Sequence, residues 1–223
     1  MKTYIKNKKI LSKNFCYDKS MEHDACGVGM IATTDGKKSR KIVDYGIEAL
    51  KSIWHRGAVD ADGKSGDGAG IQIEIAPEFF KEKILVTGHT PDETKRICVG
   101  MIFLPRTNYT HQEKCREIIE SALLQQNYYI YGWRQVPFNS NVLGRTAEQS
   151  RPEIAQVLFK KNENLETNDL ERDLFETRKK IEKLARENQW KNFYICSFSS
   201  RSIVYKGMFL AEMLAEFYPD LND

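Results

Sequence analysis

Cys26 is the residue of this sequence that is best placed to act as a nucleophile. It lies in Asp-Ala-Cys-Gly-Val-Gly at residues 24–29, directly before an apolar stretch. The flanking glycines have no side chains, so a substrate can approach the backbone beside the thiol. A free α-amino group, with a pKa of about 7.7–8.0, is a suitable base for a thiol whose pKa is about 8.5. Cys26 would become a self-contained catalyst if the chain were cut before it, although a cysteine beside an apolar strand is also a common core residue.

Arg56 is the second candidate, in Trp-His-Arg-Gly-Ala at residues 54–58. One interpretation is structural: basic residues at a helix C-terminus face the negative end of the dipole, and Gly57 caps the helix. The other is functional, with the Arg56 guanidinium reaching the Cys26 terminus and ordering it. The sequence leaves both interpretations open.

A glycine-rich segment, Ser-Gly-Asp-Gly-Ala-Gly-Ile, occupies residues 65–71 and leads into an expected strand. A dinucleotide-binding loop requires a strand before its glycines and a helix after them, and here that order is reversed. We therefore exclude nucleotide binding by this segment. We expect a tight turn that brings its backbone next to another strand.

The sequence predicts no metal site. Its five cysteines are widely spaced, and none has a histidine at a zinc-ligand interval. The odd cysteine count and the lack of an export signal indicate reduced thiols in the cytosol. We expect Cys98, Cys115 and Cys196 in the core, because they fall in apolar strands or on the apolar face of a helix. The histidines form no cluster, and a histidine base is unnecessary if the α-amine takes that role.

Apolar patterning predicts the strands that would position these residues. Residues 97–104 are apolar throughout and residues 193–198 are rich in aromatic residues, so both suit buried strands, whereas residues 70–76 alternate like a half-buried strand. Residues 27–34, directly after Cys26, are expected to form a short apolar strand. Residues 202–205 are expected to return as the hairpin partner of residues 193–198.

Helical periodicity predicts helices over residues 41–54, 108–126 and 169–187. The expected buried faces are Ile42, Tyr45, Ala49 and Ile53 in the first, Cys115, Ile118, Ile119 and Leu123 in the second, and Leu170, Leu174, Ile181 and Leu184 in the third. Asn168 or Asp169 is expected to cap the third helix, and its charged runs are expected to form a solvated face. Strands and helices without strict alternation favour a layered α+β fold.

Composition bounds the function classes. The 223 residues are 41% hydrophobic and 29% charged, which suits one globular domain. Basic residues number 34 and acidic residues 31, and no apolar run approaches the roughly 20 residues that span a bilayer. We therefore expect neither nucleic acid nor a membrane as a partner. Residues 1–15 differ, because they carry five lysines and no acid, and we expect a solvated, loosely held leader.

An ordered set of segments resembles the start of the amidotransferase domain of glutamate synthases. The set begins with residues 24–29, with His-Arg-Gly-Ala at 55–58 and with Gly-Asp-Gly-Ala-Gly-Ile at 66–71. It continues with Tyr-Gly-Trp-Arg at 131–134, Val-Leu-Gly at 142–144, Thr-Ala at 146–147, Phe-Tyr-Ile-Cys-Ser at 193–197, Ser-Ser-Arg at 199–201, Ile-Val-Tyr-Lys-Gly-Met at 203–208 and Phe-Tyr-Pro-Asp-Leu at 217–221. No single motif is specific, but the ordered set is.

The resemblance implies a class II amidotransferase, which is an N-terminal-nucleophile hydrolase with a four-layer αββα sandwich. Residues 1–25 would be a propeptide-like leader, and residues 26–223 the N-terminal portion of the amidotransferase domain, incomplete at its C-terminal end. In such enzymes the cysteine thiolate, here that of Cys26, attacks the side-chain amide of glutamine. Ammonia leaves, and water then frees glutamate from a thioester. Arg56 would order the Cys26 terminus.

The resemblance also implies functional groups outside this segment. The family's oxyanion and glutamine-binding residues lie beyond Asp223, so we expect little or no glutaminase activity from the chain alone. No cofactor is expected here, whereas FMN and an iron–sulfur cluster are implied for the full-length enzyme. Its synthase domain would combine the ammonia with 2-oxoglutarate, using electrons from a small reductase subunit or a ferredoxin. The implied compartment is the cytoplasm, or the plastid in a eukaryote.

Two other interpretations stay open. A non-catalytic remnant that acts as a binding or interaction module would account for the missing oxyanion donors, while the intact motifs around Cys26 favour the enzyme. An amidotransferase with a different acceptor is disfavoured by the motifs after residue 130.

Overall fold

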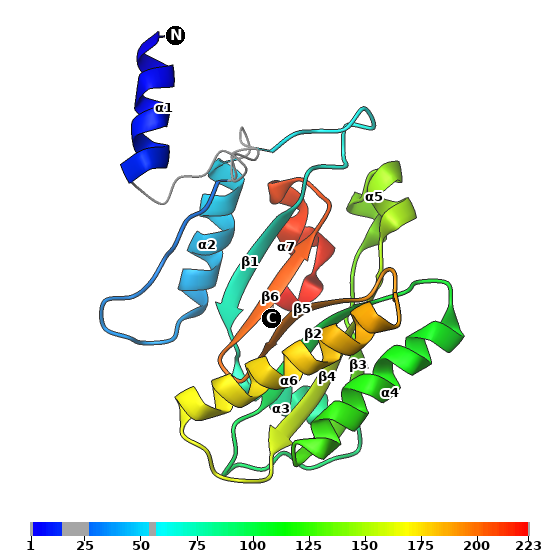
Figure 1. Cartoon of the computed structure of the whole chain (residues 1–223). Coiled ribbons are helices and arrows are strands. Elements are labelled where there is room, and N and C mark those ends of the chain that lie inside the picture. Colours follow the sequence, from blue (N-terminus) through cyan, green and yellow to red (C-terminus); the bar gives the residue numbers. More distant parts are fainter. Residues whose placement is uncertain (1, 15–26, 54–56, 223) are drawn as a thin grey trace.

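The computed structural model describes residues 2–14, 27–53 and 57–222, which form an α+β fold (Figure 1). The strands are β1 (Ala69–Glu74), β2 (Cys98–Leu104), β3 (Tyr128–Gln135), β4 (Glu153–Lys161), β5 (Tyr194–Ser199) and β6 (Ser202–Gly207). The α-helices are α1 (Lys2–Asn14), α2 (Arg40–Ser52), α3 (Pro77–Val86), α4 (Tyr109–Gln125), α5 (Arg145–Ser150), α6 (Thr167–Glu187) and α7 (Leu214–Phe217). The 3₁₀ turns are η3 (Ser140–Val142), η4 (Ala211–Met213) and η5 (Pro219–Asn222). The α+β class expected from the sequence is confirmed.

Two antiparallel sheets organise these elements. The larger has the order β3-β4-β2-β5, and the smaller pairs β1 with β6. β2 is central because its side chains are apolar on both faces, and all but one of its residues are buried. β1 alternates between half-buried and exposed residues, as predicted, because only one of its faces meets the core.

Helices α4 and α6 cover one face of the larger sheet (Figure 1). Their apolar stripes join that face in one hydrophobic cluster, in which Ile119, Leu123 and Leu174 are fully buried. A second cluster joins the opposite face of the larger sheet to the smaller sheet, through residues such as Met101 and Ile203. Two clusters therefore lie on the two faces of the larger sheet.

Two predicted strand features are wrong. Residues 27–34 form no strand, and Val28 and Met30 are 92% and 91% exposed, because no described strand pairs with this segment. β6 follows β5 directly but pairs with β1, with Tyr205 opposite Ile71, so it is not the hairpin partner of β5. The chain changes sheets at the turn between the two strands.

The carboxylate of Glu171 on α6 holds that turn. It accepts hydrogen bonds from the Ser199 hydroxyl (2.8 Å), the Ser200 hydroxyl (2.6 Å) and the Ser200 N–H (2.8 Å). Asp173, one helical half-turn further, accepts from the Tyr128 hydroxyl at 2.5 Å and pairs with Lys161. The expectation that this charged run is only a solvated face is therefore wrong.

The three predicted helices exist, but three details differ. α2 buries Ile47 with Val43 and Leu50 packed beside it, rather than the stripe from Ile42 to Ile53, and Tyr45 is exposed. The segment has apolar residues on two faces, so its period alone could not select the buried one.

On α6, Leu184 is 40% exposed, although Leu170, Leu174 and Ile181 are buried as predicted. The N-cap is Glu166 without a side-chain hydrogen bond, so neither Asn168 nor Asp169 caps this helix. Among the described helices, none has the length and apolar composition needed to cross a membrane.

Candidate functional site

The two predicted site residues, Cys26 and Arg56, lie outside the described residues, so the structure gives no distance between them. The residues that follow each of them are described. Gly27 begins an exposed irregular segment, and Gly57 begins a loop that runs to β1. The surroundings of the predicted site are therefore built from this loop and its contacts.

A short hairpin ties the Arg56 motif to the glycine-rich motif. The N–H of Ala58 donates to the Asp67 carboxylate at 3.2 Å, and the N–H of Asp67 donates to the Ala58 carbonyl at 3.3 Å. Val59 and Gly66 form an antiparallel bridge inside this pair. The backbone two residues after Arg56 is thus fixed to the segment that leads into β1.

Asp62 at the tip of this hairpin anchors it to the start of α5. Its carboxylate accepts from the Ser65 hydroxyl at 2.6 Å, the Ser65 N–H at 2.7 Å and the Thr146 N–H at 3.2 Å. The hydrogen bonds from Ser65 and its neighbours hold the pKa of Asp62 well below its usual range. The Ser65 hydroxyl in turn accepts from the Ala147 N–H at 3.0 Å. The hairpin is thereby joined to the motif at residues 142–147.

Sequence reasoning missed Asp62, although a signal was available. An aspartate before glycine, with a serine three residues on, is a pattern typical of a side chain that caps its own turn. The long-range contact also needs Gly144, because a Cβ there would overlap Asp62 and Ser65. That part of the site depends on an approach between distant segments and has no local signal.

The glycines before β1 allow it to lie close to β6. A Cβ on Gly70 would come within 2.6 Å of the Lys206 Cβ, which no real side chain tolerates. Gly68 has φ +120, a conformation that favours glycine, and lies against the Gly207 carbonyl. The glycine-rich segment therefore brings backbone next to another strand, as the sequence predicts.

Three further motifs meet at a buried ion pair. The Arg134 guanidinium on β3 binds both carboxylate oxygens of Asp220 in η5, at 2.7 and 2.6 Å. The Tyr205 hydroxyl on β6 donates to the same carboxylate at 3.2 Å, and burial with the nearby carboxylate raises the pKa of Tyr205 above its usual value. Arg134, Tyr205 and Asp220 belong to three different motifs, so segments far apart in the sequence form one network.

The three described cysteines are not nucleophiles at neutral pH. Cys98 on β2, Cys115 on α4 and Cys196 on β5 are buried, as predicted. Burial raises the pKa of Cys115 to about 12 and that of Cys196 to about 11, and it raises the pKa of Cys98 further. Among the described residues, no group of three or more His, Cys, Asp or Glu side chains could hold a metal ion.

Comparison with known proteins gives one family match and a consistent group of relatives. The model of the class-II glutamine amidotransferases matches residues 26–223, so the match begins at Cys26. The chain is 53% identical over 207 residues to the glutamate synthase [NADPH] large chain of Azospirillum brasilense. This alignment covers 93% of this chain and 14% of that protein. It is 44% identical to the ferredoxin-dependent glutamate synthase of Pyropia yezoensis, over 90% of this chain and 13% of that protein.

A plant relative agrees with these two. The ferredoxin-dependent, chloroplastic glutamate synthase of Spinacia oleracea is 37% identical over 91% of this chain and 12% of that protein. The chain thus spans about an eighth of the length of these relatives. Because the family model covers nearly all of the sequence, the chain belongs to the class-II glutamine amidotransferases.

Proposed function

We propose that this chain is the glutamine-hydrolysing part of a glutamate synthase, with Cys26 as its nucleophile. The observation that carries the proposal is the family match that begins at Cys26, together with 53% identity to a glutamate synthase large chain. Residues 1–25 are then a leader that must be removed to free the α-amino group of Cys26. Residues 26–223 are the amidotransferase portion.

The chemistry follows from the cysteine itself. The freed α-amine takes the thiol proton, and the thiolate attacks the side-chain carbonyl carbon of glutamine. The tetrahedral intermediate collapses when the amide nitrogen takes a proton and leaves as ammonia, which produces a thioester. Water then attacks the thioester and releases glutamate and the thiol. Arg56 orders the Cys26 terminus. The hairpin that the Ala58–Asp67 hydrogen bond closes fixes the backbone that follows Arg56 in the sequence.

We further propose that the domain is a four-layer αββα sandwich. Its support is the packing of four sets of elements. α2 lies beside β1, β1 pairs with β6, these two strands share a hydrophobic cluster with the larger sheet, and α4 with α6 cover the far face of that sheet (Figure 1). The two hydrophobic clusters would fill the space between sheets and between the larger sheet and its helices.

In the longer enzyme, the ammonia would pass to a synthase domain that combines it with 2-oxoglutarate. FMN and an iron–sulfur cluster would supply the electrons there. The described residues do not fit the iron–sulfur cluster, because Cys98, Cys115 and Cys196 are buried on separate elements and no described group of His, Cys, Asp or Glu side chains could hold a metal. We therefore assign the cluster, and FMN with it, to other parts of the longer protein, where a reductase subunit or a ferredoxin would deliver the electrons. We propose the cytoplasm as the compartment, with the plastid as the alternative in a eukaryote.

N-terminal sequencing and intact mass of the protein isolated from its source, with an antibody against residues 57–222, test the leader. We expect a polypeptide that begins with Cys26. A protein that still carries Met1 would contradict the proposal, and the binding-module interpretation would then replace it.

Replacement of the thiol tests the nucleophile in the protein as its source makes it. Cys26→Ala is expected to abolish glutamate formation from glutamine, while formation from added ammonia persists because the synthase step does not need the thiol. Cys16→Ser is the matched control, since that residue lies in the leader, and it should retain glutamine-dependent activity. Unchanged use of glutamine by Cys26→Ala would overturn the proposal.

A further inference from the structure

β3 forms an open edge of the larger sheet. It runs for eight residues, with a shift in its register against β4 between Ile130 and Gly132. Among the described strands it pairs only with β4, and no hydrogen bond between described residues reaches its outer backbone groups. The other edge strand, β5, has a backbone group that a side chain already satisfies: the Arg178 guanidinium donates to the Ile195 carbonyl at 2.8 Å. A long strand with free N–H and C=O groups is a template for another extended segment.

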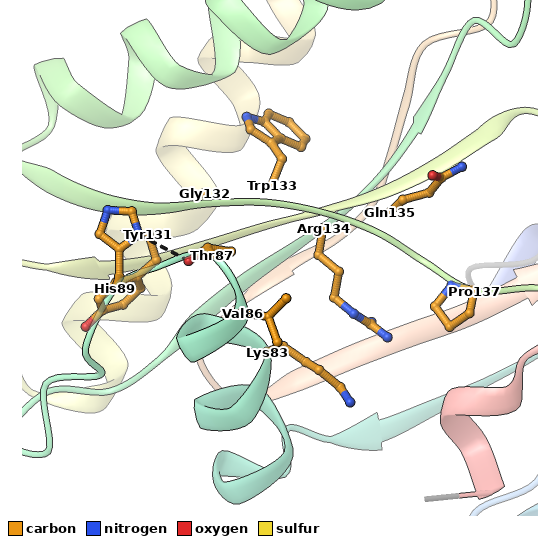
Figure 2. Close-up of a pocket in the computed structure, with 10 residues that line it drawn as sticks. All are labelled: Lys83, Val86, Thr87, His89, Tyr131, Gly132, Trp133, Arg134, Gln135 and Pro137. Atoms are coloured by element: carbon orange, nitrogen blue, oxygen red, sulfur yellow. Dashed lines mark hydrogen bonds between the residues drawn. The ribbon is translucent and has the colours of Figure 1, made fainter.

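A hollow of about 760 Å³ lies beside this edge, between β3 and the end of α3 (Figure 2). Figure 2 shows Arg134, Lys83 and Val86 on one side of β3, whereas Trp133 and Gln135 point to the other side. Val86 is 85% exposed, so an apolar side chain stands uncovered at the rim. The hollow can therefore receive side chains from a segment that lies along the strand.

The hollow has one unbalanced positive charge. Its lining includes the basic side chains of Lys83 and Arg134 and no carboxylate. Asp220 neutralises Arg134, but Lys83 makes no ion pair with a described carboxylate, and its ammonium lies 4.4 Å from the centroid of the Phe79 ring. An occupant with acidic side chains would balance this charge.

Two other carboxylates that contact β3 do so on the side opposite Arg134. Glu120 accepts from the Trp133 indole at 2.6 Å, and Glu153 accepts from the Gln135 amide at 2.7 Å. Because the Trp133 and Gln135 side chains extend to the side of β3 opposite Arg134 and Lys83, these carboxylates do not pair with Lys83 (Figure 2).

We propose that β3 and this hollow form a docking surface for an extended, acidic segment of another polypeptide. The segment would add to the sheet through main-chain hydrogen bonds to β3. Its alternate side chains would face the hollow, a carboxylate at Lys83 and an apolar side chain at Val86. A second copy of this chain is a poor occupant, because two such hollows would bring like charges together across a two-fold axis.

Two synthetic peptides test the surface: a decapeptide of alternating Glu and Val, and its counterpart of alternating Lys and Val. Binding is measured by titration, and the site is located by hydrogen exchange of the backbone amides. We expect the acidic peptide to bind at least tenfold more tightly than the basic one and to slow exchange in β3. Its affinity should fall as salt is added, since the contact with Lys83 is a screened charge interaction.

Charge variants at Lys83 in the hollow and at Lys180 on α6 test whether the charge of the hollow determines binding. Lys83→Glu should weaken binding of the acidic peptide at least tenfold, and Lys83→Gln by less. Lys180→Glu, on the solvated side of α6, is the matched control and should bind like the parent. Thermal unfolding of each variant verifies that it is folded.

Four results would overturn the proposal. The first is equal affinity for the two peptides, and the second is protection that falls outside β3. The third is protection of β3 that grows with protein concentration, which would assign the edge to a second copy. The fourth is protection of β3 in the protein isolated from its source that is independent of concentration, which would mean that its own polypeptide covers the edge. None of these results bears on Cys26, so the outcome is separate from that of the glutaminase test.

Discussion

Arg134 and Asp220, which are 86 residues apart in the sequence, form a bidentate ion pair with distances of 2.7 and 2.6 Å. Their side chains are only 14% and 2% exposed. Gln156 accepts a further hydrogen bond from Arg134, and Tyr205 donates one to Asp220. This network fastens the edge strand β3 to η5, the last described turn of the chain. The network therefore holds the motifs at residues 131–134, 203–208 and 217–221 against one another.

Removal of the carboxylate from this pair should be strongly destabilising. Asp220→Ala leaves the Arg134 guanidinium in a desolvated position without a counter-ion, which typically costs about 3–5 kcal/mol. The measurement is the free energy of unfolding in urea. In the double variant Arg134→Met with Asp220→Ala, the uncompensated charge is gone, so part of the loss should be recovered.

An exposed pair provides the comparison. Lys183 and Glu187 lie 3.8 Å apart on α6 with side chains 70% and 56% exposed. Glu187→Ala should therefore change the free energy of unfolding by less than about 1 kcal/mol. A loss at Asp220→Ala no larger than that would contradict the role given to the buried pair.

Gly100 in the centre of β2 allows close packing that alanine would disturb. A Cβ there would lie 2.7 Å from the Val157 Cγ1 and 2.8 Å from the Phe198 ring. Gly100→Ala should cost about 1–3 kcal/mol in the free energy of unfolding, the usual range for an overpacked core. Gly29→Ala is the control, because among the described residues beyond its two chain neighbours no atom lies within 4 Å of the added carbon, and it should be neutral or slightly stabilising. Equal stability of the two variants would show that the core yields at Gly100.

The sequence predicted the strands β1, β2 and β5, whose local residue patterns indicate burial. It did not predict β3 and β4, which contain polar residues that are buried in the fold. β2 is apolar throughout, β5 is rich in aromatic and apolar residues, and β1 alternates, so each could be recognised. β4 contains the fully buried Gln156, which is satisfied by partners from other elements. β3 contains Gly132 and Arg134, and the role of Arg134 depends on Asp220. Such partners cannot be read from a local window.

The site could be predicted only by its individual motifs. Their order identified the family, but how Asp62 meets the start of α5 depends on two loops whose approach is set by the fold. After Cys26, at residues 27–34, the sequence predicts a strand that the structure does not contain. The prediction rests on the apolar composition of this segment, but strand formation requires a neighbour, and no described strand pairs with it.

Asp62→Asn should loosen the hairpin that follows Arg56. The amide cannot reproduce both strong acceptors that the carboxylate offers to Ser65 and Thr146. We expect faster hydrogen exchange at the Ser65 and Thr146 amides, whereas the amides of β2 stay unchanged. Glu166→Gln is a matched control, because this N-cap side chain makes no capping hydrogen bond. Equal exchange at Ser65 in the parent and in Asp62→Asn would contradict this assignment.

The same carboxylate predicts a dependence on pH. Its pKa is lower in the folded protein than in the unfolded chain, where an aspartate titrates near 3.9. Its stabilisation of the hairpin is therefore complete well above pH 4 and is lost as the pH falls below that range. Exchange at Ser65, corrected for the intrinsic rate, should respond to acid in the parent. In Asp62→Asn it should respond much less, and an equal response would assign the titration to another group.

The thiols should divide sharply in their reactivity toward iodoacetamide. The thiolate is the reacting form, and a pKa of about 11 leaves Cys196 about one part in a thousand ionised at pH 8, against about a quarter for an ordinary thiol. We expect Cys98, Cys115 and Cys196 to stay unlabelled in the native protein for at least about 100 times longer than they do in urea. Cys26, if it is the nucleophile, should be labelled first, as peptide mass spectrometry can show. Because burial opposes the thiolate, labelling of Cys196 should accelerate as the pH rises from 8 toward 11, and rapid labelling of Cys196 already at pH 8 would contradict its burial in the folded core.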